Sequence, residues 1–538
     1  MNKPLLGSLV VATLLLGDAS AATMYERFEA MEKEMQRLQN ELANLKAEQA
    51  EAEPASRGED DEADDESDDE EKEDYSEDEA DDEEFNAQEE IEDLQETVTE
   101  LNKATSGNHL KLGVDFRTSY DSVNYEMADG SRHENNDLFT NRLWLNMNWA
   151  ANENISFTGQ LAYNKTYGQR FGVNNDPSTG GAGGFEEFDW TVNENPNGDG
   201  TVRIKSAYYF YRNDTFLGTD IPWTFSLGRR PSTNGHLINL RDNDPAASPS
   251  GHTINVEFDG LSSKFGLEKL TGVPGMYVKF CAGQGASDAS EMFANAPYSE
   301  NTSDDTKNIH LGGLIFVPYD NGQFSVGTQF YSATNLIDSK TDGSGNFKTT
   351  GNIYSGSMYA MVNGIGNEWT DFLDDTTFFV SGAMSRTDPD DGADAFTPSG
   401  NKEMLGSDQM ENGYSYWVGL NMPSLISEDG RFGLEFNHGS KYWRSITYAE
   451  DTMIGSKVAT RGDAYEAYFT EPLIDDILSL QVRYTYIDYD YAGSNGFFGS
   501  TTGTPDSMAD NAAKAALGLA PLAVDKAQDL RIYLRYRY

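Results

Sequence analysis

The chain has 538 residues, of which 38% are hydrophobic and 12% aromatic, and a formal net charge of −51. Such a negative chain repels a phosphate backbone, which excludes nucleic-acid binding as its main function. Cys281 is the single cysteine, so neither an intrachain disulfide nor a thiolate metal site can form within one chain. The 51 glycines and the aromatic content favour β structure, and the length fits either several domains or one large barrel.

Residues 1–21 have the features of a secretory signal peptide. Lys3 precedes the apolar run 5–16, and the small residues Ala19, Ser20 and Ala21 provide a cleavage site. The run is shorter than the roughly 18–20 apolar residues that a membrane-spanning helix needs. No other stretch approaches that length, so among spanning structures only a β-barrel is expected.

Residues 22–50 are predicted to form a coiled coil. Their apolar seam repeats at alternating spacings of four and three, the heptad period, and consists of Met24, Phe28, Met31, Met35, Leu38, Leu42 and Leu45. A parallel homo-oligomer is the favoured interpretation, with a trimer as the expected state. One helix lying on another surface is the alternative.

Residues 51–84 are predicted to form a disordered acidic linker, because they contain 22 Asp and Glu against only Arg57 and Lys72. We interpret the linker as a spacer. No cofactor is expected, although loosely bound divalent cations fit such carboxylates, which lack the fixed loop of a selective site. Residues 85–104 are predicted to form a short helix that either makes a second coil or caps a barrel mouth.

From residue 109 to 538 the apolar period becomes two, which predicts an all-β transmembrane antiparallel barrel. The pattern is plain at 110–116, at 142–149 and 155–163 around the turn 151–154, and at 309–317 and 324–330 around the turn 318–322. Further strands are predicted near 202–210, 223–230, 254–260, 276–282, 353–361, 377–384, 414–420, 432–436, 465–469 and 478–488. The length predicts about 16 strands, within a range of roughly 14 to 18.

Connection lengths distinguish the two ends of the predicted barrel. The short links 151–154 and 318–322 suit the periplasmic rim, and the long links 164–200, 235–252, 283–307 and 385–412 suit the outer rim. A barrel of this size is expected to enclose a water-filled lumen rather than a packed core.

The last strand has two distinct faces. One face is apolar and consists of Leu530, Ile532, Leu534, Tyr536 and Tyr538. The other contains Arg531, Arg535 and Arg537. The apolar face and the aromatic end resemble the C-terminal assembly signal of Gram-negative outer-membrane barrels.

Strand alternation also predicts the residues that line the lumen. They are mainly basic, namely Lys111, Asp115, Arg117, Arg142, Arg203, Lys205, Arg230, Arg483, Arg531, Arg535 and Arg537. Inward acids are expected to be few, chiefly Asp115, Glu257 and Glu435. Of the consecutive Arg229 and Arg230, alternation selects Arg230. The basic residues either meet solutes directly, since rings of Arg and Lys favour anions, or cross-link the inner wall through carboxylates and backbone carbonyls.

Two segments resemble Gram-negative porins: 141–163, which is similar to their early hairpin, and 226–231, which is similar to a strand end where arginine meets the lumen. The order of signal, coiled coil, acidic linker and barrel resembles a group of porin-like proteins. The resemblance implies residence in the outer membrane with the N-terminal region in the periplasm. It also implies contact with lipopolysaccharide, insertion by the barrel assembly machinery and assembly as a homotrimer.

The predicted function is therefore passive diffusion of small hydrophilic solutes or ions through an outer-membrane pore. An outer-membrane tether whose coiled coil contacts the cell wall is the alternative. A hydrolase is a third option, but none of the histidines lies in a recognisable catalytic motif. We therefore expect no enzyme activity, no catalytic residue and no metal site.

Overall fold

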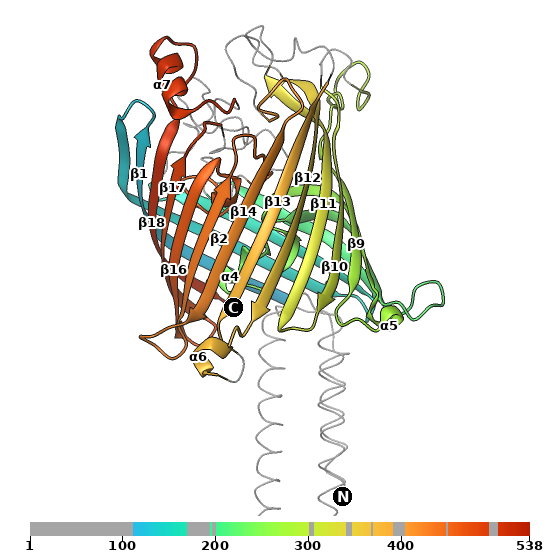
Figure 1. The fold of residues 1–538 in the computed structure, drawn as a ribbon. Coiled ribbons are helices and arrows are strands. Elements are labelled where there is room, and N and C mark those ends of the chain that lie inside the picture. Colours follow the sequence, from blue (N-terminus) through green and yellow to red (C-terminus); the bar gives the residue numbers. More distant parts are fainter. Residues whose placement is uncertain are drawn as a thin grey trace, which may run out of the picture. The chain divides into compact units, whose positions relative to one another are not determined.

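A computed structural model describes residues 111–168, 194–195, 201–300, 306–339, 347–366, 369–390, 404–447, 450–493 and 504–538. In it, 16 antiparallel strands form a closed barrel (Figure 1). The predicted fold class and strand number are therefore confirmed. The predicted signal peptide, coiled coil, acidic linker and short helix all lie outside the described residues.

The barrel strands follow one another in chain order except where β5 pairs directly with β8. They are β1 (Lys111–Met127), β2 (Arg132–Ala150), β3 (Ile155–Thr166), β4 (Val202–Asn213), β5 (Trp223–Ser232), β8 (Val256–Gly266), β9 (Tyr277–Ala286), β10 (Ile309–Asp320), β11 (Phe324–Ser339), β12 (Phe347–Asn363), β13 (Thr377–Pro389), β14 (Asn412–Pro423), β15 (Arg431–Gly439), β16 (Gly462–Ile474), β17 (Leu478–Tyr489) and β18 (Val524–Arg537).

Short elements occupy several connections between these strands. They are β6 (Gly235–His236), α4 (Asn239–Asp242) and β7 (Ala247–Ser250), then α5 (Glu268–Thr271), α6 (Asp371–Asp374), η2 (Lys457–Ala459) and α7 (Met508–Ala516). Strands β6 and β7 pair with each other in a separate two-stranded sheet. No helix in the described part of the chain is long and apolar enough to cross a membrane.

The turn predicted at 318–322 is shorter in the structure, because β10 continues to Asp320. Pro318 lies within this strand, where a register shift separates Phe316 from Tyr319. Proline has no N–H for the ladder, and such a shift accommodates it. The turn predicted at 151–154 joins β2 and β3 as expected.

Strands β1 and β18 close the barrel. Their register places Asp115 opposite Arg537 and Arg117 opposite Arg535. On β18 the alternate residues Arg531, Tyr533 and Arg535 are buried, whereas the intervening apolar side chains are exposed on the outer surface. One strand therefore separates a charged inner face from an apolar outer face.

The same division extends around the whole barrel. Large apolar side chains are exposed on the outside of most strands, including Phe116, Leu145, Phe157, Leu227, Leu261, Phe280, Leu314, Phe330, Val380, Leu434, Tyr484 and Leu534. The buried inner positions carry many serines, threonines and charged residues. The barrel is thus inverted relative to a water-soluble domain, which buries its apolar face.

Part of the lumen is occupied by apolar side chains of the connecting loops. One cluster joins Ile254 and Ile446, from two connecting loops, to inner residues such as Leu311 and Ile353. A second joins Ile454 to Val123 and Ile487. These loops therefore bring their own apolar side chains into the barrel.

Gly228 lies within β5, opposite Tyr208 of β4 and Gly260 of β8. Its φ of 132° belongs to the region that favours glycine. A Cβ at this position would lie 2.4 Å from the carbonyl oxygen of Ala207 on β4. Glycine is therefore required where β5 approaches β4 this closely.

Gly228→Ala is expected to lower the free energy of unfolding by about 1–3 kcal/mol, because alanine meets both a disfavoured φ and a backbone clash. Gly312→Ala is the matched control, since nothing lies within 4 Å of a Cβ built there. Urea unfolding followed by tryptophan fluorescence measures both variants. Equal stability of the two would contradict this role for Gly228.

Candidate functional site in the barrel lumen

Two connecting loops enter the lumen. The 233–255 loop joins β5 to β8, and its contacts reach strands on opposite walls. The Ser250 N–H donates to Gln329 Oε1 of β11 (2.7 Å), and the Tyr533 hydroxyl of β18 donates to Asp242 Oδ1 (2.7 Å). Since β11 and β18 lie nearly opposite each other in strand order, the loop crosses the interior.

The second loop, 440–461, joins β15 to β16 and binds the first loop by backbone hydrogen bonds. The Asn255 N–H donates to the Ile446 carbonyl (2.7 Å), and the Ile446 N–H donates to the Thr253 carbonyl (3.0 Å). Ile254 and Ile446 also share an apolar cluster. The two loops therefore form one connected insertion inside the barrel.

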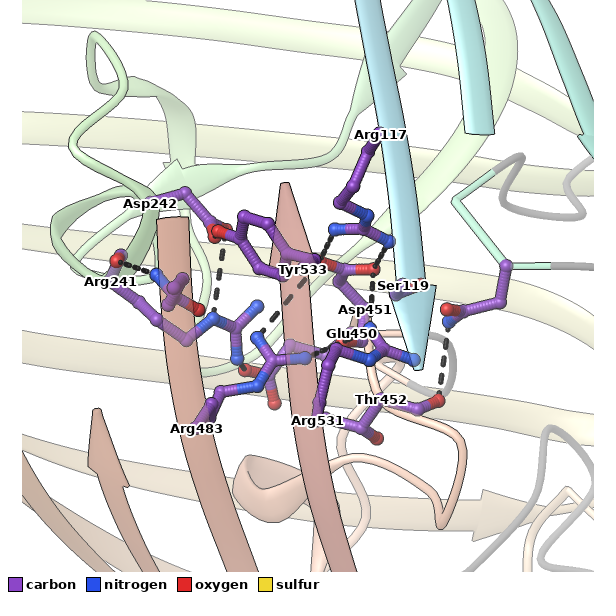
Figure 2. A network of polar contacts seen from close by, with 12 residues as sticks. Arg117, Ser119, Arg241, Asp242, Glu450, Asp451, Thr452, Arg483, Arg531 and Tyr533 are labelled. Carbon is purple, nitrogen blue, oxygen red and sulfur yellow. Dashed lines mark hydrogen bonds and ion pairs between the residues drawn. The ribbon is translucent and has the colours of Figure 1, made fainter. Parts of the chain in front are cut away.

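Asp451 of the 440–461 loop is the centre of a buried ion-pair network (Figure 2). Arg117 of β1 donates both of its terminal nitrogens to the carboxylate, at 2.5 and 2.6 Å. Arg531 of β18 approaches the same carboxylate at 3.2 Å and also pairs with Asp121 of β1. The Asp451 carbonyl accepts from Arg483 Nη2 of β17 (2.5 Å) and Arg531 Nη1 (2.9 Å).

The charge of Asp451 is stabilised by these neighbours. Burial by itself would raise the pKa of this carboxyl, but the guanidinium groups of Arg117, Arg531 and Arg142 hold it well below its usual range. Asp451 therefore stays ionised at neutral and mildly acidic pH. A bidentate arginine–carboxylate pair also fixes the relative orientation of its two groups, so it holds the 440–461 loop in one position against the inner wall.

Lys457, in the same loop, is the centre of a second cluster. Its ammonium group lies 2.6 Å from Glu435 and 3.6 Å from Glu450, and it also pairs with Glu466. Burial disfavours the charged form, but these three carboxylates raise the pKa of Lys457 above its usual value. Arg241 of α4 joins the cluster at 2.7 Å from Glu450. The cluster therefore holds both loops against β15 and β16.

A third cluster lies beside the last residues of β18. Asp244 of the 233–255 loop receives Arg535 at 3.1 Å and Arg537 at 2.7 Å. Arg535 also pairs with Asp115 of β1 at 2.5 Å, and Asp115 lies 3.6 Å from Arg142 of β2. This cluster joins the first loop to the seam at which the barrel closes.

A fourth group lies on β4, β5 and β8. Lys205 is 2.8 Å from Glu257 and 3.5 Å from Glu194, and Arg229 is 3.2 Å from Glu257. Arg229 thus reaches a buried inner carboxylate, although simple alternation assigned the inward position to Arg230 alone. Strand alternation therefore did not predict this contact of Arg229, whose Nε also donates to the Ile204 carbonyl of β4 (2.8 Å).

Most of the predicted pore-lining residues are buried and ion-paired. The side chains of Asp115, Arg117, Arg142, Lys205, Arg483, Arg531 and Arg535 are at most 7% exposed. Arg537 is partly exposed and Arg203 half-buried, and Lys111 is exposed at the start of β1. The guanidinium group of Arg230 lies 4.3 Å from the ring centroid of Tyr208. The buried members of this set therefore pair with carboxylates of other strands or of the two loops.

The inner wall carries more acids than expected. Asp121, Glu466 and Asp529 are buried inner residues in addition to Asp115, Glu257 and Glu435. Asp121 could have been predicted, because it continues the alternation of the inner residues Asp115, Arg117 and Ser119. The loop partners Asp242, Asp244, Glu450 and Asp451 were missed because loop residues have no periodicity that indicates where they point.

His252 fixes the 233–255 loop to the opposite wall. Its ring nitrogens lie 2.8 Å from Ser381 Oγ of β13 and 2.9 Å from Ser415 Oγ of β14. Burial lowers the pKa of His252 to about 3, so the ring is neutral at physiological pH. The ring is completely buried, so it acts as an anchor rather than as an accessible base.

Another part of the inner wall stays accessible. Lys264 on β8 is exposed, and Tyr208, Arg230, Tyr277 and Lys279 on β4, β5 and β9 are half-buried. The two loops therefore cover the lumen unevenly. They bury the charged inner residues of β1, β2 and β15–β18 and leave side chains of β4, β5, β8 and β9 in reach of solvent.

Asp451→Asn is expected to lower the free energy of unfolding by about 3–5 kcal/mol, because it leaves several buried guanidinium groups without their carboxylate. The 440–461 loop should also become more susceptible to proteases. Asp476→Asn, at an exposed turn, is the matched control. Urea titration and limited proteolysis measure the effects, and an Asp451→Asn protein as stable as the control would contradict the anchoring role.

His252 also predicts a dependence of stability on pH. Its pKa in the folded protein lies below the ordinary value of about 6.5, so the unfolded chain binds the extra proton first. The stabilisation is complete above pH 6.5 and is lost as the pH falls towards 3, by up to about 1.4 kcal/mol per pH unit. His252→Gln should flatten the slope of unfolding free energy between pH 6.5 and 5; an unchanged slope would refute this assignment.

A family model described as "Protein of unknown function (DUF3373)" matches residues 132–538. No curated protein sequence matches the chain.

Among solved structures, OmpF of Salmonella typhi in complex with daunomycin has 12% identity and a TM-score of 0.42, and the match covers 81% of this chain and 99% of that one. An anion-selective porin from Comamonas acidovorans has 11% identity, coverages of 80% and 99%, and a TM-score of 0.42. OprB of Pseudomonas putida has 12% identity, coverages of 82% and 97%, and a TM-score of 0.42. At these scores the likeness carries no argument about function.

Proposed function

The chain belongs to the family described as "Protein of unknown function (DUF3373)", and we propose that it is an outer-membrane channel for passive diffusion of small hydrophilic solutes or ions. The observation that carries the proposal is a closed barrel with an apolar outer surface and a polar, partly accessible inner wall. Both the proposed membrane location and the proposed solute path depend on this inverted arrangement.

The outer surface supports residence in a membrane. Large apolar side chains such as Phe157, Phe280 and Phe330 are exposed on strands all around the barrel. In water such a surface would drive association, whereas in lipid it is the favoured surface. Closure between β1 and β18 also leaves no unpaired barrel edge, which a bilayer requires of a spanning sheet. An outer membrane is the site at which such barrels are found.

The inner wall supports a channel rather than a solid plug. Asn146 and Lys264 are exposed, and Gln160 and Tyr208 are half-buried, on strands that the two loops do not cover completely. These groups are polar or amphipathic and suit hydrated solutes. In this proposal the loops narrow the lumen, and the buried arginines hold them in place.

The remaining features predicted from the sequence form part of the same proposal. The signal peptide 1–21 directs export, and the coiled coil 22–50 forms a periplasmic homotrimer that is joined to the barrel by the acidic linker 51–84 and the short helix 85–104. The apolar face of β18 guides insertion by the barrel assembly machinery. Lipopolysaccharide surrounds the outer rim, where loosely bound divalent cations can bridge the two.

A structural tether is the second candidate function. It is favoured by the extent to which the two loops bury the inner wall of β1, β2 and β15–β18. In a tether the barrel would serve only as an anchor, and the coiled coil would contact the cell wall. The two functions differ in whether the lumen conducts.

Purified protein in planar lipid bilayers is expected to give stepwise increases in conductance, because each inserted barrel adds an aqueous path of fixed size. Asp451→Asn should increase the current noise or the mean step, since it releases the 440–461 loop from the wall. Folding can be verified independently from the heat-dependent electrophoretic migration of the barrel. Correctly folded protein that never conducts would refute the channel and favour the tether.

A further inference from the structure

We propose that the turn between β4 and β5 (residues 214–222) and the helix α5 together form a lipid anchor, from which Leu217 and Leu270 insert into the adjoining leaflet of the membrane. The ligand class is the acyl chain of a membrane lipid. The inference rests on the membrane location proposed above. It goes beyond that location because it assigns a lipid-binding role to residues outside the barrel strands.

The turn and α5 are joined to each other at the end of the barrel where Figure 1 shows α5 and α6. The Gly266 N–H, directly before α5, donates to the Pro222 carbonyl of the turn (2.8 Å). Lys269 of α5 pairs with Asp220 of the turn at 2.7 Å. The two segments therefore hold each other in position.

The turn packs on the outer surface of the barrel. The ring centroid of Phe216 lies 5.3 Å from that of Trp223 and 4.9 Å from that of Phe265. Trp223 and Phe265 are opposite each other in the pairing of β5 with β8. Strand alternation places them on the same face as Leu227 and Leu261, which are exposed on the outside. The turn therefore extends the apolar outer surface that is proposed to face lipid.

The aromatic base of the turn does not need water. A buried tryptophan needs an acceptor for its indole N–H. Here the Trp223 Nε1–H donates to the Thr215 carbonyl of the turn itself (2.9 Å). This part of the surface can therefore lose its water on contact with lipid.

Leu217 occupies the tip of the turn in a conformation that leucine disfavours. Phe216 and Thr219 exchange two backbone hydrogen bonds, at 2.9 and 3.1 Å, and enclose Leu217 and Gly218. These two residues have φ values of 49° and 82°. A two-residue turn with positive φ at both positions favours Asn-Gly, because asparagine tolerates this region far better than leucine does.

The side chain of Leu217 gains no packing within the protein that would offset this strain, because it is 89% exposed. Leu270 on α5 is 69% exposed, and none of the residues of α5 is buried. Two large apolar side chains held in water by a strained turn and a short helix indicate contact with another apolar medium. Lipid is that medium, since the anchor is continuous with the apolar outer surface.

The charged groups of the anchor are compatible with a position at the membrane surface. Asp220 and Lys269 balance each other in their ion pair. Glu268 accepts from the Gly275 N–H (3.1 Å) and is exposed. An interfacial anchor keeps such groups in water while its apolar side chains enter the leaflet. Only the two leucines need to leave water.

The test uses full-length protein in phosphatidylcholine vesicles, some of whose lipids carry a nitroxide on an acyl chain. Cys281→Ser removes the native thiol, so that one introduced cysteine carries a bimane label. At Leu217→Cys and Leu270→Cys, nitroxide lipids should quench most of the fluorescence and aqueous iodide should quench little. Leu270→Cys reads the same anchor from a position without strain. Heat-dependent electrophoretic migration verifies the folding of each variant.

Two matched positions serve as controls. Glu153→Cys lies in the exposed turn between β2 and β3 at the same end of the barrel, and should be quenched by iodide but not by nitroxide lipid. Phe330→Cys lies on the outer surface of β11, where the native side chain is 52% exposed, and should be quenched by nitroxide lipid.

The outcomes separate the anchor from the proposed function. Iodide quenching at positions 217 and 270 that equals quenching at 153, with lipid quenching retained at 330, would overturn the anchor alone. Shielding of 217 and 270 from both quenchers would also overturn it and would indicate contact with a second copy of the chain. Absence of lipid quenching at 330 would refute the membrane location. Lipid quenching at all three positions in a protein that never conducts would support the anchor and refute the channel.

Discussion

Buried guanidinium groups on the inner wall are stable only when they pair with carboxylates. These ion pairs determine the position of both loops inside the barrel. Arg117, Arg142, Arg483 and Arg531 come from four strands and converge on Asp451, which none of those strands supplies. An unpaired buried charge costs several kcal/mol, on the order of 3–5. The 440–461 loop is therefore held inside the barrel by the wall's own charge. Asp244 is a second loop carboxylate held by wall arginines, and Lys457 is a loop cation held by wall carboxylates.

The consequence is a lumen with two unlike sides. On one side, the guanidinium groups are neutralised by ion pairs that stabilise the barrel. On the other, Arg230 and Lys264 lie against tyrosine rings. Net charge conceals this division, because the chain as a whole carries −51. The location of a cation relative to its carboxylates, rather than the number of cations, decides whether it can act on a solute.

The sequence predicted the strands well, because a wall between lipid and lumen imposes a period of two that local sequence must obey. Leu530 to Tyr536 on β18 show it plainly, with Arg531 and Arg535 on the buried side. The packed part of the lumen could not be predicted in the same way. Asp451 and His252 lie in loops whose partners are far away in the chain, and no periodicity connects them. Arg229 was misplaced because alternation alone assigns it to the outer face, whereas its side chain reaches the buried carboxylate of Glu257.

The long sequence separation of the buried ion pairs bears on how the protein reaches its final state. Arg117 and Asp451 are 334 residues apart, and Arg531 and Asp121 are 410 apart. The second pair joins the first barrel strand to the last, so it cannot form before the sheet has curled round on itself. Before the barrel closes, the charged inner residues of β1 and β18 lack these partners and must be hydrated. Circular closure and the expulsion of water from this side of the lumen are thus expected to be one late, cooperative event in folding.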